Sequence, residues 1–96
     1  MEKKTKKGVL KYRMPNILEA YDILEASGIT EGTPSQLKMK KNIIQSMDYL
    51  LDFTEIEGVT TYAELLEDTE NMIVPLGEIA DEVISKAFNA FKKKSS

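Results

Sequence analysis

Carboxylates are the side chains in this sequence whose number and clustering come closest to suggesting chemistry. One group lies between residues 64 and 70, and a second lies between residues 78 and 82. Two carboxylates can divide acid and base roles when burial separates their pKa values, and a calcium loop needs alternating oxygen ligands around a glycine. The first group lacks that glycine, and both groups lie opposite the apolar stripes of predicted helices. We therefore expect solvated carboxylates, with no catalytic residue and no metal site.

The other residue types that support catalysis are missing or isolated. The sequence contains no histidine and no cysteine, so serine and threonine have no histidine to activate them as nucleophiles. The five glycines are scattered and form no phosphate-binding loop. These features predict a non-enzymatic protein without a cofactor, and the absence of cysteine gives no indication of secretion.

The charges are sorted along the chain. Residues 1–13 have a net charge of +5, residues 14–91 have −11, and Lys92–Lys94 add +3, which gives the total of −3. An acidic body repels phosphates, so basic protein partners are favoured over nucleic acid. No apolar run is long enough to cross a bilayer or to serve as a signal peptide. We expect a cytoplasmic protein that does not bind membranes.

The periodicity of apolar residues predicts a mainly α fold of about four helices in a single domain over residues 8–93. Flexible tails are expected at residues 1–7 and 94–96, and short β-strands near Val9–Met14 and Phe53–Glu57. The expected helices run over residues 17–27, 34–52 and 61–68, and from Pro75 or Leu76 to about Lys93.

Capping signals mark three of these helix starts. Asn16 with Glu19, and Thr61 with Glu64, match the capping box, while Thr33 before a proline predicts the start of the second helix. In the first helix one expected face is apolar and the opposite face is acidic. The apolar face contains Ile17, Leu18, Tyr21 and Leu24, and the acidic face contains Glu19, Asp22 and Glu25.

The last predicted helix has an unusually wide apolar stripe. Such a stripe can pack on two neighbouring helices, or part of it can remain exposed and dock a partner or a second copy. The sequence leaves both alternatives open. The candidate protein-binding residues on this stripe are Leu76, Ile79, Val83, Phe88 and Phe91.

Three segments resemble the small tail assembly chaperones of long-tailed bacteriophages. They are the basic strand and helix start at residues 10–17, the turn and short helix at residues 58–66, and the closing helix at residues 76–91. The resemblance implies a helical, non-enzymatic protein of the bacterial host cytoplasm. It would bind the tape measure protein, keep it soluble and help to recruit tail tube subunits. Members of this family are often also made in a longer, frameshifted form, and Lys92–Lys94 is compatible with a slippery codon run.

Two other functions fit the residue chemistry. An acidic adaptor or regulatory protein could act as a homodimer through the last helix. A DNA-mimic inhibitor could present a continuous negative face to a basic nuclease. Both are binding functions and require no catalytic residue.

Overall fold

The structure, a computed structural model, describes residues 1–28, 32 and 34–95, with side chains as far as residue 90. The expected mainly α fold with a few short strands is confirmed. In chain order the elements are β1 (Glu2–Thr5), β2 (Gly8–Tyr12), α1 (Ile17–Ala26), α2 (Gln36–Ser46), the short 3-10 helix η2 (Met47–Leu50), β3 (Leu51–Asp52), α3 (Tyr62–Glu67) and α4 (Thr69–Ser95).

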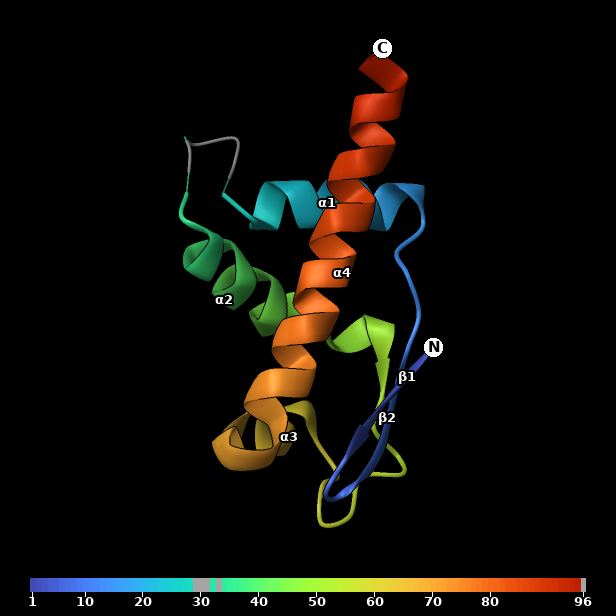
Figure 1. Ribbon diagram of the computed structural model, residues 1–96, viewed down its shortest axis with the longest axis vertical. Helices are drawn as coiled ribbons and strands as arrows, with labels where there is room; N and C mark the ends of the chain where they lie inside the picture. The colour runs from blue at the N-terminus through green and yellow to red at the C-terminus, as the bar shows by residue number, and fades with distance from the viewer. Residues whose placement is uncertain (29–31, 33, 96) are drawn as a thin grey trace.

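Helix α4 is the element on which the others assemble. It runs along the long axis of the molecule, with α1 crossing it and the β1–β2 hairpin beside its first half (Figure 1). Helices α1, α2 and α3 and strand β1 all contact α4. Its buried side forms the centre of the core and consists of Met72, Leu76, Ile79, Ala80, Val83 and Ala87.

Helix α4 begins earlier than the sequence predicted. We expected the helix to start at Pro75 or Leu76, because proline has no amide hydrogen and is favoured at a helix start. The helix instead begins at Thr69 and contains Pro75 within it. Asp68 precedes the first turn: its carbonyl accepts a hydrogen bond from the Met72 amide at 3.0 Å, and its carboxylate accepts from the Asn71 side chain. Pro75 cannot donate a helical hydrogen bond, and the burial of Met72 and Pro75 in the core offsets this loss of stability.

The N-terminal residues form a strand rather than the flexible tail that we expected. Strand β1 pairs with β2 in an antiparallel hairpin, with Lys3 opposite Leu10. The Lys3 ammonium lies 3.4 Å from the Glu82 carboxylate and 4.0 Å from that of Glu78, both on α4. The basic composition of this segment suggested a solvated tail, but its lysine has an acidic partner on a distant helix.

The region after α2 also differs from the prediction. The expected helix 34–52 is divided into α2, η2 and β3. Ser35 caps α2 by accepting a hydrogen bond from the Lys38 amide at 3.2 Å, whereas Thr33, the expected cap, lies outside the described residues. Strand β3 adds to the free edge of β2, where the Arg13 amide donates to the Leu50 carbonyl at 3.0 Å.

The strand expected at residues 53–57 is not formed. In this segment Ile56 alone makes a bridge, to Gly8. Among the described residues, strand β3 pairs only with Lys11 and Tyr12, and the chain then turns, because the Ile56 amide donates to the Phe53 carbonyl at 3.1 Å. The sheet order is therefore β1-β2-β3.

Alanine substitutions at two glycines, Gly77 and Gly8, should change the stability of this fold in opposite directions. Gly77 lies inside α4, where a methyl group would meet the Lys40 side chain at an ordinary 3.6 Å. Gly77→Ala should therefore raise the free energy of unfolding by roughly 0.5–1 kcal/mol, because alanine restricts the unfolded chain and favours helix. Urea denaturation measures this change.

Gly8→Ala is the opposite control. Gly8 has a φ of +136°, and an added Cβ would lie 2.0 Å from the Glu55 carbonyl oxygen. We expect this variant to be destabilised by more than about 1 kcal/mol. Equal effects of the two substitutions would contradict the close approach of β2 to the Glu55 backbone.

Candidate protein-binding surface on α1

The candidate residues on α4 do not form a surface. Leu76, Ile79 and Val83 are 3%, 0% and 0% exposed, and they belong to the core. Phe88 is half-buried, and the side chain of Phe91 lies outside the described residues. At Leu76, Ile79 and Val83 the stripe of α4 is covered by neighbouring elements of the same chain, so these three residues are unavailable to a partner in this fold.

Helix α1 carries the largest group of exposed apolar side chains among the described helices, while α4 exposes the neighbouring Ile73 and Val74, at 63% and 65%. The buried side of α1 is centred on Ile23, with Ala20 and Leu24 packed against the core. On the opposite side, Ile17 is 77% exposed, Leu18 is 75% exposed and Tyr21 is 49% exposed. Tyr21 follows Ile17 by four positions and Leu18 by three, so it neighbours both of them on the helix surface. We call Ile17, Leu18 and Tyr21 the α1 surface.

The prediction of one apolar face on α1 opposite an acidic face is wrong. Leu24 packs against the core, whereas Ile17, Leu18 and Tyr21 are exposed on the side that also carries Asp22 and Glu25. A helix that is apolar on most sides is usually buried on most sides, and α1 has apolar residues at seven of its ten positions. This excess of apolar residues is the signal that could have indicated a surface available to a partner. A single helix lying across α4 cannot bury all of them.

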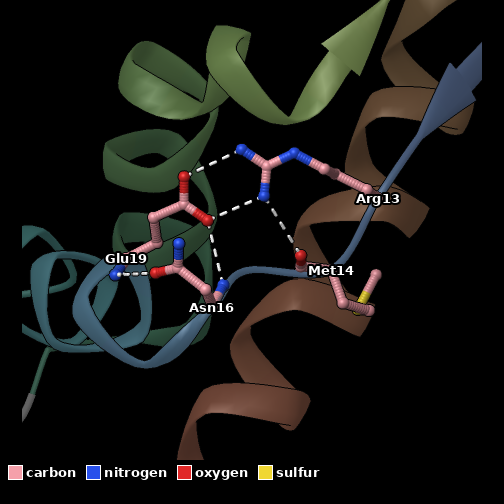
Figure 2. A network of polar contacts seen from close by, with 4 residues as sticks. All are labelled: Arg13, Met14, Asn16 and Glu19. Atoms are coloured by element: carbon pink, nitrogen blue, oxygen red, sulfur yellow. Dashed lines mark hydrogen bonds and ion pairs between the residues drawn. The ribbon is translucent and has the colours of Figure 1, made fainter.

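A network of polar contacts fixes the start of α1 (Figure 2). The Asn16 side chain accepts a hydrogen bond from the Glu19 amide, and the Glu19 carboxylate accepts from the Asn16 amide, both at 2.9 Å. The two terminal guanidinium nitrogens of Arg13, Nη1 and Nη2, donate to the same carboxylate, at 2.7 and 2.8 Å. The end of β2 and the first turn of α1 are thus tied together across Pro15.

The network also sets the charge state of Glu19. The hydrogen bonds from Arg13, together with the one from the Asn16 backbone, lower the pKa of this carboxyl from 4.5 to about 2. Glu19 is therefore ionised throughout the physiological range, and its charge is balanced by Arg13. The α1 surface begins on the same helical turn and is held in a fixed orientation by this pair.

Two further carboxylates lie on the exposed side of α1. Asp22 follows Leu18 by one helical turn and Glu25 follows Tyr21 by one turn, and both are exposed. Helix α1 contains no lysine, arginine or histidine. We call Asp22 and Glu25 the α1 carboxylates.

The hydroxyl groups of the buried Tyr12 and the half-buried Tyr62 make hydrogen bonds that hold the fold together. Tyr12 donates to Glu82 on α4 at 2.8 Å, and its burial, with this bond, raises its pKa to about 12. Tyr62 donates to the Ile44 carbonyl, and burial raises its pKa as well. Both hydroxyls join elements that are distant in the sequence.

Within the described residues, no three acidic side chains lie close enough together to hold a metal ion. The helices of this part of the chain also include none with the length and apolar character that crossing a membrane requires. The α1 surface, with three exposed apolar side chains, is a larger group than the pair Ile73 and Val74 on α4.

Comparisons of the chain with protein-family models, with curated proteins and with solved structures find no match.

The pKa of Glu19 predicts a specific pH dependence of stability. Glu19→Gln keeps the capping box, because glutamine can accept the same hydrogen bond, but it removes the negative charge. The folded pKa of about 2 lies below the ordinary 4.5, so the ion pair stabilises the fold above pH 4.5 and this contribution is lost towards pH 2.

The measurement compares the free energies of unfolding of the wild type and Glu19→Gln in urea at a series of pH values. The difference should be largest above pH 4.5 and should shrink as the pH approaches 2. A difference that stays constant over this range would mean that the charge of Glu19 contributes nothing to folding.

Two isoleucines test which apolar face is buried. Ile79→Ala should lower the free energy of unfolding by about 2–5 kcal/mol, because the 0% exposed side chain leaves a cavity in the core. Ile17→Ala should change it by no more than about 0.5 kcal/mol, because 77% of Ile17 is already in water. Thermal or urea denaturation measures both, and similar losses would show that α1 is buried differently.

Proposed function

We propose that this protein is a non-enzymatic assembly chaperone of the kind used to build the tails of long-tailed bacteriophages. It binds the tape measure protein, keeps this client soluble in the host cytoplasm and helps to recruit tail tube subunits around it. The observation that carries this proposal is the α1 surface, where two adjacent aliphatic side chains are each about three-quarters exposed.

Exposed apolar residues that are grouped on one helix favour a binding function. Single exposed apolar residues are normal on protein surfaces, whereas contiguous ones often mark an interaction site. Ile17, Leu18 and Tyr21 share one exposed side of α1, and the capping network holds that side in place. A long helical client with an apolar stripe would bury these side chains against its own.

The size of the α1 surface indicates weak binding by each copy. Burying an isoleucine or leucine side chain contributes roughly 1.5–3 kcal/mol, while association costs an estimated 4–15 kcal/mol in lost motion. Three side chains therefore give at most a modest affinity. Several copies along one client chain would raise the overall affinity, and each copy could be displaced as the tube assembles.

The segment at residues 10–17, on which the resemblance to tail assembly chaperones partly depends, leads directly to this surface. It contains most of β2, the arginine that pairs with Glu19, and the first residue of α1. The second such segment, residues 58–66, leads through the Thr61 capping box into α3.

The structure gives less support to the two other candidate functions, the homodimeric adaptor and the DNA mimic. A homodimer through the stripe of α4 would have to use residues that are already buried in the monomer. A DNA mimic needs a continuous negative face, and on α4 two carboxylates are paired with lysines, Glu82 with Lys3 and Asp81 with Lys40 at 3.2 Å. The assembly chaperone is therefore the function that we propose.

Co-expression with the tape measure protein encoded in the same genome tests this function. The wild-type chain should increase the soluble fraction of the client, measured by quantitative gel analysis of cleared lysates. Leu18→Asp should remove this gain, because it places a charge in the α1 surface while an acidic residue in the first helical turn remains favourable for folding.

Leu37→Asp is the matched control. Leu37 is 80% exposed and occupies the second position of α2, as Leu18 occupies the second position of α1. This variant should solubilise the client as well as the wild type does. No gain in client solubility with the wild-type chain would refute the proposed function.

A further inference from the structure

Among the described residues, some carboxylates form ion pairs with lysine or arginine and others form none. On α4, Glu78 and Glu82 share Lys3, and Asp81 pairs with Lys40. On α1, Glu19 pairs with Arg13. In the described part of the chain, Asp22 and Glu25 form no ion pair, although both are exposed beside the α1 surface.

In the part of the chain that the structure describes, Asp22 and Glu25 thus place two negative charges without ion pairs on this side of α1, and a nearby cation is Lys38 of α2, which lines the same pocket as Glu25. Tyr49 of η2 lies on the flank of α1, and its pKa is raised by partial burial and by the nearby charges of Glu19 and Asp22. Arg13 reduces this effect without cancelling it. A cation on a partner would meet favourable charge here, and an anion would be repelled.

We propose that the α1 surface selects an amphipathic helix whose apolar stripe is flanked by lysine or arginine side chains. This inference rests on the proposed function and specifies the charge of the client segment. Asp22 lies one turn after Leu18 and Glu25 lies one turn after Tyr21, so the α1 carboxylates border the apolar side chains on the same exposed side.

The shape of the surface favours a helix as the partner. The apolar side chains form a ridge along one helix, and such ridges fit between the side-chain rows of a second helix. An extended peptide would instead need a free strand edge for backbone hydrogen bonds. The α1 surface offers side chains rather than such an edge, because its backbone is hydrogen-bonded within the helix.

The expected selectivity is moderate because the carboxylates are exposed. Two ion pairs at a protein surface together change affinity by about two- to thirtyfold. Repulsion of an acidic helix adds to this difference, and salt screens both effects. Apolar contact thus supplies affinity, and the α1 carboxylates determine which helices are accepted.

Two synthetic peptides of about 20 residues provide the test. They share one leucine stripe, and the flanking positions are lysine in one peptide and glutamate in the other. Fluorescence anisotropy with the full chain measures both dissociation constants. The lysine peptide should bind at least about fivefold more tightly in about 50 mM salt, and this ratio should fall in about 500 mM salt.

Charge-reversal variants show whether the preference arises at α1. Asp22→Lys combined with Glu25→Lys should abolish or reverse the preference for the lysine peptide. Glu57→Lys combined with Glu67→Lys changes the net charge equally at exposed positions outside α1, and it should preserve the preference. Leu18→Asp should weaken binding of the lysine peptide, whereas Leu37→Asp should leave it unchanged.

Equal binding of the two peptides would overturn the inference, as would equal effects of the two double variants. Failure to bind either peptide would overturn it as well. The proposed function has a separate test in co-expression: if Leu18→Asp abolishes client solubility while the peptides bind equally, the function stands and charge selection fails. A lysine preference that depends on Asp22 and Glu25, without any solubilised tape measure protein, would sustain the inference and refute the function.

Discussion

Burial of one side of α4 is the constraint on which this fold depends. Helices α1, α2 and α3 and strand β1 each contact α4, and its core side chains are almost fully buried. Each buried aliphatic side chain contributes roughly 1.5–3 kcal/mol, which is a large share of the stability of a small domain. The buried positions of α4, Ile79 and Val83 among them, are therefore used in holding the chain together and are not open to a partner.

The exposure of the α1 surface follows from this arrangement. Helix α1 is apolar on more than one side, but it crosses α4 and also contacts α2, so only the side centred on Ile23 is covered. Ile17 and Leu18 remain in water because no other described element reaches them. The ion pair between Arg13 and Glu19 and the cap formed by Asn16 hold the first turn of α1 in this orientation (Figure 2).

Folding also redistributes the charges that are sorted along the chain. Lys3 from the basic N-terminus and Lys40 from α2 reach the acidic side of α4 and pair with its carboxylates. The α1 carboxylates have no such partner within the described residues, and the exposed apolar ridge is therefore bordered by negative charge. Helix α1 thus carries exposed apolar side chains beside exposed carboxylates, and both proposals depend on this combination.

The sequence by itself determined the features that depend on neighbouring residues. The mainly α class and the capping boxes of α1 and α3 were predicted correctly, because a cap involves residues only three positions apart. The sequence did not predict the early start of α4, the pairing of β1 or the placement of β3, because each of these depends on contacts between distant segments. Periodicity shows that a helix has an apolar side, but it does not show what covers that side. Only the tertiary structure decided that Ile79 lies in the core and Ile17 at the surface, because burial depends on which elements the folded chain brings together.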